Sequence, residues 1–160
     1  MDSKPDLEKC MIFIDKEGNW FYQDSPMIHK SIVLFLYENL HRDQWGRYII
    51  EWQDQVCEVD VEDTPYVIQR ADMQNDGSNQ KQFLAITLND GSVEKLDFET
   101  LRVGQENVPY CSVKGGQFEA RFLRQAYYQL TQFIEVDEQK QQYYMLLNGE
   151  RLILPPLSSQ

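Results

Sequence analysis

Hydrophobic and polar residues alternate in many short stretches of the chain, with the two-residue period of strands that have one solvated face. The clearest stretch is 57–61, where three apolar residues alternate with Glu58 and Asp60. Similar runs predict strands at 12–14, 20–22, 47–52, 66–69, 83–88, 93–98, 110–113, 143–147 and 152–154. Turn-forming sequences such as Asn89-Asp90-Gly91 and Asn148-Gly149 separate several of them. The pattern therefore predicts antiparallel meanders.

Two segments instead repeat apolar residues at helical spacing. In the first, such residues recur at every fourth position from Ile28 to Leu40, and the apolar run 32–37 widens the surface. We expect this helix to be buried on most sides. Ser25 before Pro26 predicts its start, because the hydroxyl can cap free amides and proline loses no hydrogen bond at the first position. The second helix is expected after Gly116, with the apolar stripe Leu123, Ala126, Tyr127, Leu130 and Ile134.

Two pairs of segments echo each other in sequence. Residues 62–66 are matched by 106–110, and the helix-plus-hairpin of 37–50 is matched by 127–145. We expect an α+β fold of two duplicated subdomains, 1–61 and 62–160, each a small antiparallel sheet with one helix. Neither half could bury its apolar face well alone, so the halves should pack tightly together. Coincidence in a sequence rich in Tyr and Gln is the alternative.

Composition and charge limit the classes of partner and location. The longest apolar run, 32–37, is far shorter than the roughly 20 residues of a membrane span, and the first ten residues lack the features of a signal peptide. Cys10, Cys57 and Cys111 are interpreted as free thiols of a reducing compartment, which predicts a cytoplasmic location. The net charge of −11 argues against long nucleic acids and anionic membranes, but a small anionic ligand needs only a local pocket.

One segment of this acidic chain is rich in cations. Lys114, Gly115 and Gly116 precede the second predicted helix, and free amides at a helix start can hold an anion. Arg121 and Arg124 follow within two helical turns and would add positive charge. A glycine turn with solvated cations is the alternative interpretation, since no recognised phosphate-binding motif is present.

Aromatic and acidic side chains provide further candidates. Tyr66 and Tyr110 each follow a proline and could stack a ligand base, although tyrosines that follow a proline at a strand start are more commonly core residues. Asp63 follows a row of alternating carboxylates and could cap a turn or pair with Arg124. The row itself, Glu58, Asp60 and Glu62, is interpreted as a solvated strand face. No motif nominates a catalytic residue, a metal ligand or a cofactor.

Several of these motifs together resemble an uncharacterised bacterial family, domain of unknown function 1285. The matching pieces are Gly18 with Trp20, 61–63 with Pro65-Tyr66, Pro109-Tyr110 with Val113, Lys114 to Arg121, Arg124, Tyr127-Tyr128, Leu130 and Asn148-Gly149. The resemblance implies two duplicated halves, the second loosely like a pleckstrin-homology fold, with a nucleotide-type ligand site between them and a role in signalling. Thr64 and Trp45 depart from the family pattern and could reshape the rim of such a site.

The leading functional hypothesis is a non-catalytic small-ligand-binding or regulatory protein for an anionic, nucleotide-like ligand. Lys114, the amides of Gly115 and Gly116, Arg121 and Arg124 would hold the charge, with Tyr66 or Tyr110 stacking a ring. A protein-interaction adaptor that adds a partner strand to an exposed sheet edge is the second hypothesis. An unassigned hydrolase is the third.

Overall fold

The computed structural model describes residues 3–78 and 80–155 of the chain. It divides the chain into two compact units, Met1–Pro65 and Tyr66–Gln160, here called unit 1 and unit 2. The boundary predicted from the sequence lies four residues earlier, between 61 and 62.

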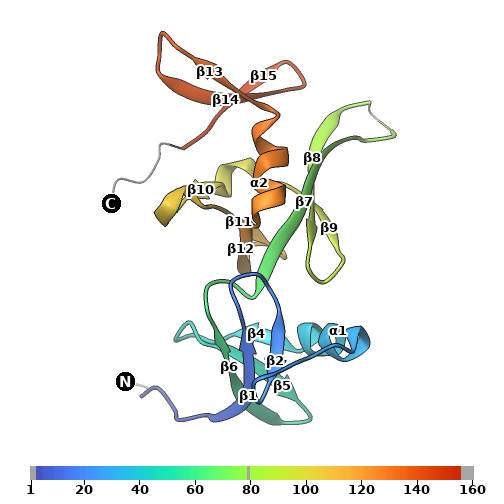
Figure 1. Ribbon diagram of the computed structural model, residues 1–160, viewed down its shortest axis with the longest axis vertical. Coiled ribbons are helices and arrows are strands. Elements are labelled where there is room, and N and C mark those ends of the chain that lie inside the picture. Colours follow the sequence, from blue (N-terminus) through green and yellow to red (C-terminus); the bar gives the residue numbers. More distant parts are fainter. Residues whose placement is uncertain (1–2, 79, 156–160) are drawn as a thin grey trace. The chain divides into compact units, whose positions relative to one another are not determined.

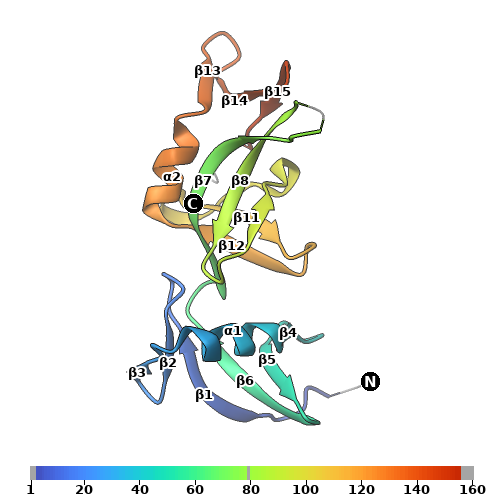
Figure 2. The same cartoon turned by 90° about the vertical axis from the view of Figure 1, so that its right-hand side faces the viewer.

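Unit 1 is built on one six-stranded sheet, sheet A (Figure 1). Its elements in chain order are β1 (Glu8–Ile14), β2 (Trp20–Tyr22), β3 (Ser25–Pro26), α1 (Lys30–Glu38), β4 (Leu40–Arg42), β5 (Tyr48–Trp52) and β6 (Gln55–Val61). The strand order is β3-β2-β1-β6-β5-β4, so two antiparallel meanders meet through one parallel pair, β1 with β6. Helix α1 connects the two meanders and runs along one side of sheet A (Figure 2).

Helix α1 differs from its prediction in both its start and its burial. Ser25–Pro26 pair with β2 as strand β3, and the helix begins at Lys30, where His29 provides no side-chain cap. Tyr37 is its buried residue, whereas Ile32 and Phe35 are exposed. The Tyr37 ring packs edge-on against Trp20, and its hydroxyl donates a hydrogen bond of 2.7 Å to the Pro65 carbonyl. The half-exposed Phe35 ring also packs edge-on against Trp52 of β5, with ring centres 5.8 Å apart. Two aromatic contacts, rather than a broad buried apolar face, therefore attach the helix to sheet A.

A disulfide joins Cys10 of β1 to Cys57 of β6, with their Cα atoms 5.0 Å apart. The interpretation of these two residues as free thiols was wrong. The bond depends on the parallel pairing of β1 with β6, in which Glu8 lies opposite Cys57, and no local sequence pattern indicates that pairing. Cys111 is free and buried, as predicted.

Unit 2 contains a second six-stranded sheet, sheet B, with the same topology as sheet A. Its elements are β7 (Tyr66–Asn75), β8 (Gln82–Leu88), β9 (Val93–Lys95), the 3-10 helix η1 (Phe98–Thr100), β10 (Arg102–Val103), the 3-10 helix η2 (Gln105–Asn107), β11 (Pro109–Val113) and β12 (Phe118–Phe122). The strand order is β10-β11-β12-β7-β8-β9, and β7 is parallel to β12. As in sheet A, the first strand of the first meander pairs in parallel with the last strand of the second meander.

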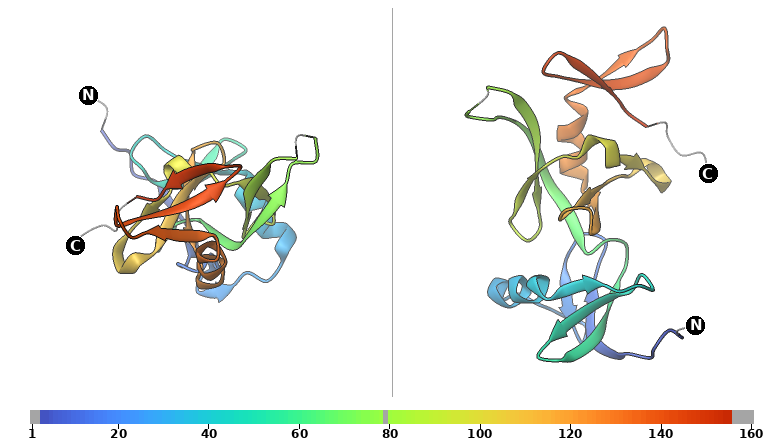
Figure 3. Two further views of the ribbon diagram at one scale, coloured as in Figure 1. Left: turned by 90° about the horizontal axis from the view of Figure 1, so that it is seen from above. Right: turned by 180° about the vertical axis from the view of Figure 1, so that it is seen from behind.

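The chain continues from sheet B into helix α2 (Arg124–Thr131) and then into a three-stranded antiparallel sheet, sheet C. Sheet C consists of β13 (Ile134–Asp137), β14 (Gln142–Leu147) and β15 (Glu150–Ile153). Ala126 and Leu130 of α2 are buried, and the Gln129 side-chain oxygen accepts a 2.8 Å hydrogen bond from the Ala71 amide of β7. Sheet C lies at the C-terminal end of α2 (Figure 3). Its Met145 is buried, so sheet C is part of the unit 2 core.

The α+β fold class and the two similarly built halves are confirmed. The sheets differ from the prediction in one parallel pair each, and the third sheet was not predicted as a separate element. The helices also occupy different places, because α1 lies between two meanders of sheet A and α2 follows both meanders of sheet B. Within the described residues, no helix is long and apolar enough to cross a membrane.

Candidate functional site

The predicted anion-binding turn belongs to a β-hairpin and not to a helix start. Residues 114–117 connect β11 to β12, and Lys114, Gly115 and Gly116 all have positive φ angles, of 56°, 68° and 87°. Glycine adopts positive φ angles at little energetic cost, which explains why residues 115 and 116 of this turn are both glycine. Helix α2 begins only at Arg124. The prediction of amides at a helix N-terminus was therefore wrong, and the helix dipole contributes nothing to this turn.

Lys114 is already paired within unit 2. Its ammonium donates hydrogen bonds to the Asp90 carboxylate at 2.6 Å and to the Ser92 hydroxyl at 2.9 Å, and it lies 5.2 Å from the centre of the Tyr66 ring. Its backbone amide donates to the Glu94 carboxylate. Burial alone would raise the pKa of Asp90, but the hydrogen bonds from Lys114 and Ser92 hold that pKa below its ordinary value. Side chains of unit 2 thus occupy the Lys114 ammonium that the sequence assigned to a ligand, and the Gly116 amide donates to the Val113 carbonyl.

The two predicted arginines do not lie at the turn that contains Lys114. In the β11–β12 hairpin, Val113 pairs with Phe118 beside the turn. Arg121 pairs with Tyr110, three residue pairs further from the turn, which corresponds to about 10 Å along the strand at a rise of ~3.3 Å per residue. Arg124 lies beyond the hairpin and is exposed. The structure therefore brings Lys114 to Tyr66 but does not gather the three cations around one turn.

Both predicted stacking residues are buried in unit 2. Tyr66 is 4% exposed and packs edge-on against Phe118, with ring centres 5.1 Å apart. Tyr110 is 8% exposed, and the Arg102 guanidinium covers its ring at 4.3 Å. These contacts favour core packing, which was also the more common interpretation from the sequence.

The acidic row lies in unit 1 and is partly neutralised there. The Lys9 ammonium forms ion pairs with Glu58 at 3.1 Å and with Asp60 at 3.3 Å, and Glu62 accepts a hydrogen bond from the Lys16 amide. Asp63 follows in the bend between β6 and β7, and its pairing with Arg124 stays a prediction. In the part of the chain that the structure describes, no three His, Cys, Asp or Glu side chains form a group that could hold a metal ion.

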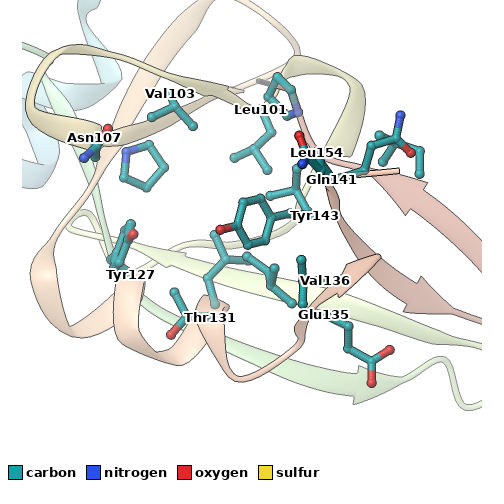
Figure 4. A pocket seen from close by; sticks show the side chains of 16 residues that line it. Leu101, Val103, Asn107, Tyr127, Thr131, Glu135, Val136, Gln141, Tyr143 and Leu154 are labelled. Carbon is teal, nitrogen blue, oxygen red and sulfur yellow. The ribbon is translucent and has the colours of Figure 1, made fainter. Parts of the chain in front are cut away.

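A cleft of about 850 Å³ in unit 2, here called the C-terminal cleft, is the candidate site (Figure 4). One wall is the segment of β10, η2 and the start of β11, the second is the side of α2, and the third is sheet C. The lining residues are Leu101, Val103, Asn107, Pro109, Tyr127, Leu130, Thr131, Ile134, Glu135, Val136, Gln141, Gln142, Tyr143, Ile153, Leu154 and Pro155. Most of them are apolar or aromatic.

Register within sheet C determines which side chains face the cleft. Directly opposed residues of antiparallel strands point to the same side of a sheet, and Val136 is opposite Tyr143. Leu154 donates its amide to the Tyr143 carbonyl, which places it in the same row. Leu146, one residue along β14 from Met145, is on the opposite face. Sheet C therefore presents an apolar face to α2 and leaves Val136 and Tyr143 about half exposed, at 49% and 57%.

The polar side chains that line the C-terminal cleft are neutral, with the exception of Glu135. Glu135 is the lining carboxylate among the described residues, and Figure 4 shows it directed away from the space that Tyr143 enters. The Thr131 hydroxyl is engaged, since it donates to the Tyr128 carbonyl at 2.7 Å. The hydroxyls of Tyr127 and Tyr143 form no hydrogen bond with the residues that the structure describes. These two phenols and the side-chain amides of Asn107, Gln141 and Gln142 are the neutral groups that can orient a ligand.

None of the lining residues belonged to the predicted site. From the sequence, Tyr127, Leu130 and Ile134 were assigned to the apolar stripe of a helix, and Tyr143 to a hairpin. The available signal was the alternation of Ile134 and Val136 with acidic residues, which predicts a strand where the sequence analysis extended the helix.

Comparison with known proteins supports the fold. No family model and no curated protein matches the chain. The crystal structure of a DUF1285 family protein from Silicibacter pomeroyi DSS-3 is similar with a TM-score of 0.73 and 20% identity, over 92% of this chain and 80% of that one. A DUF1285 family protein from Shewanella baltica OS155 gives a TM-score of 0.61 and 17% identity, over 76% of this chain and 91% of that one. The resemblance to this family is thus confirmed at the level of the fold.

Proposed function

We propose that this protein is a non-catalytic, small-ligand-binding regulatory protein whose ligand occupies the C-terminal cleft. The observation that carries the proposal is the cleft itself, a space of about 850 Å³ with a largely apolar lining and a few neutral polar groups. Ligand sites in proteins typically have volumes of about 300–1,000 Å³ and this kind of lining.

The chemistry of the lining supports binding rather than catalysis. Acid–base or nucleophilic catalysis needs an activated side chain within reach of the substrate. The described lining residues include neither histidine nor cysteine nor lysine, and the Thr131 hydroxyl donates to a backbone carbonyl. Glu135 is directed away from the cleft (Figure 4). A bound molecule would be held and not transformed.

The arrangement of the three walls supports a regulatory role. Sheet C follows α2 after two residues and shares no strand pairing with sheet B among the described residues. A ligand that touches Leu101, Leu130 and Tyr143 together would contact all three walls. Its binding free energy would then stabilise the docked position of sheet C, and occupancy would be signalled by that position.

This proposal retains the predicted role and changes the predicted ligand site. The C-terminal cleft has no lysine or arginine among its described lining residues, and Lys114 is paired with Asp90. A nucleotide-like anion held by Lys114, Arg121 and Arg124 between the two units stays a prediction of the sequence. So do the pleckstrin-homology likeness, the signalling role and the cytoplasmic location. The cysteines no longer support that location, because Cys10 and Cys57 are bonded to each other.

The adaptor hypothesis is the weaker alternative. Strand addition needs a row of unpaired amides and carbonyls along a sheet edge. The edge strands of sheet B are β9, with three residues, and β10, with two. Such short edges offer few hydrogen bonds to a partner strand.

Binding of the neutral dye N-phenyl-1-naphthylamine to the full chain tests the proposed function. We expect saturable binding of one dye per chain, detected by its fluorescence increase. Val103→Trp should abolish it by filling the C-terminal cleft. Leu146→Trp, which adds the same ring to the opposite face of sheet C, should leave it unchanged. Absence of saturable binding, or equal binding to both variants, would contradict the proposal.

A thermal-shift panel extends this test to biological compounds. The panel should include nucleotides, cyclic dinucleotides, inorganic phosphate and uncharged apolar metabolites. A ligand at a hundredfold excess over its dissociation constant stabilises the folded state by about 2.7 kcal/mol. A compound of the C-terminal cleft should lose this effect in Val103→Trp, whereas an anion bound at Lys114 should lose it in Lys114→Met.

A further inference from the structure

We infer that the C-terminal cleft selects an uncharged ligand, a mainly hydrocarbon molecule that ends in one neutral hydroxyl or amide group. This inference rests on the proposed function and names the class of ligand that the site takes. Three features of the cleft lead to it: the extent of the apolar surface, the absence of a cation from the described lining, and the two phenols at one end that form no hydrogen bond with described residues.

The apolar surface continues across all three walls. Leu101 and Leu130 are buried at its base, at 4% and 2% exposure, and Val103 extends the first wall. Val136 and Leu154 continue it over sheet C. Removal of hydrocarbon from water is favourable in proportion to the area that is buried. A ligand must therefore be apolar over most of its length to use this surface.

A negative charge on the ligand would have no partner in the C-terminal cleft. Its described lining contains no Lys, Arg or His, and the chain carries a net charge of −11. Arg102, which precedes a lining residue, pairs with the Glu119 carboxylate, and its guanidinium covers the Tyr110 ring. Burial of a carboxylate or phosphate without a paired cation is strongly unfavourable. The cleft should therefore discriminate against fatty acids and phosphorylated ligands.

A positive charge has little to attract it inside the cleft. The Glu135 carboxylate is directed away from the enclosed space, as Figure 4 shows. Tyr127 and Asn107 lie at the opposite end of the cleft from Glu135, and the Tyr143 hydroxyl points toward that end (Figure 4). Phenols and an amide can donate and accept hydrogen bonds with an uncharged group. One alcohol or amide at this end of the ligand meets them without the cost of burying a charge.

The experiment compares three probes with the same ten-carbon chain and different head groups: 1-decanol, decanoate at pH 8, and decyltrimethylammonium. Each is titrated against N-phenyl-1-naphthylamine bound to the full-length protein, below the micelle concentration of the charged probes. We expect decanol to displace the dye at a concentration at least about tenfold lower than either charged probe, because each of them must bury an unpaired charge.

A charge introduced at the cleft wall provides the matched test. Val136→Lys adds an ammonium to a position that is 49% exposed, so it should fold, and it should improve decanoate binding at least about tenfold. Leu146→Lys, at 54% exposure on the other face of sheet C, should leave the order of the three probes unchanged. Circular dichroism of both variants confirms the fold, and the wild-type comparison needs no variant.

Each result decides a different claim. If the dye does not bind the wild type, the proposed function fails. If the dye binds and decanoate displaces it as well as decanol does, the cleft binds ligands but the inferred class is wrong. If decyltrimethylammonium is the best probe, the ligand is cationic and the inference is likewise overturned.

Discussion

Removal of the Cys10–Cys57 disulfide should destabilise unit 1 by about 4 kcal/mol. The bond joins residues 47 positions apart in sequence and so closes a loop that contains most of sheet A. In the chain-entropy account, a cross-link reduces the entropy of the unfolded chain by about 2.1 + 1.5R ln n cal/mol/K, which for this separation corresponds to ~4 kcal/mol at 25 °C. Cys10→Ser and Cys57→Ser should each produce the whole effect, because either change breaks the bond.

Tryptophan fluorescence can follow this effect in unit 1 alone. Trp20, Trp45 and Trp52 all lie in unit 1, and Trp20 is buried against Tyr37. In a urea titration of the oxidised protein, this signal should change at a midpoint about 1.3–4 M above that of the serine variants, given m-values of ~1–3 kcal/mol/M for small proteins. Reduction of the wild type with dithiothreitol should move its midpoint to that of the variants.

Two controls make the reasoning refutable. Cys111→Ser changes a buried, free cysteine of unit 2 and should leave the tryptophan-detected midpoint and its response to dithiothreitol unaltered. The double variant should equal each single variant. If the oxidised and reduced wild types unfold within about 1 kcal/mol of each other, the loop-closure argument is wrong for this chain. If the single variants differ strongly, contacts of the individual sulfurs and not the bond dominate.

Three further outcomes are expected in unit 2. In denaturant titrations followed by near-ultraviolet circular dichroism, Met145→Ala should lower the free energy of unfolding of unit 2 by about 2–5 kcal/mol, whereas Leu146→Ala, at an exposed neighbouring position, should change it by no more than about 0.5 kcal/mol. Equal effects of the two substitutions would mean that sheet C does not pack into the core of unit 2. Burial would raise the pKa of Asp90, but hydrogen bonds from Lys114 and Ser92 lower it below 3.8, so the stability that the Asp90–Lys114 pair contributes is present above about pH 4 and is lost as the pH falls through the folded-state pKa. Acid titration should therefore show a shallower loss of stability in Asp90→Asn than in the wild type, and an unchanged profile would exclude the pair as the cause of that loss. Burial, and to a smaller extent the charges of nearby carboxylates, raise the pKa of Cys111 to about 12. Cys111 of the native protein should therefore react with iodoacetamide at pH 8 at least about 100-fold more slowly than that of the unfolded protein, and a rapid native reaction would show that the thiol is accessible.

The parts of the fold that the sequence predicted well are those with a clean local period. Residues 57–61 alternate apolar with acidic side chains and form the end of β6. The hairpin of β14 and β15 turns at Asn148-Gly149, the sequence that most strongly favours a two-residue turn. In both places a few neighbouring residues determine the structure, so a single sequence is sufficient.

The largest error arose where two periods run together. Phe118, Ala120 and Phe122 are buried at the two-residue spacing of strand β12. Ala126 and Leu130 follow at helical spacing in α2. The glycine pair before them favoured one long helix, and with it an anion site that the hairpin does not form. Only the pairing of β12 with both β11 and β7 separates the two patterns.

The C-terminal cleft follows from a difference in pairing between two similar segments. A helix followed by a three-stranded meander occurs twice, as α1 with β4, β5 and β6 and as α2 with β13, β14 and β15. In unit 1, β6 of that meander pairs with β1, and the three strands become half of a six-stranded sheet. In unit 2, β7 pairs with β12, a strand that precedes the helix, so the last meander has no sheet to join among the described residues.

The apolar face of that last meander is then covered only in part. Met145 packs into the core, while Val136 and Tyr143, in the same face, remain about half exposed beside β10 and α2. In a strand that joins a six-stranded sheet, such side chains would belong to a continuous core. The cleft therefore depends on which of the two meanders provides the parallel partner of β7. The observed pairing joins residues 66–68 to 120–122, which are too far apart in sequence for a local pattern to predict it. A binding site that arises in this way can be recognised in the fold, although each of its residues looks like an ordinary core residue in the sequence.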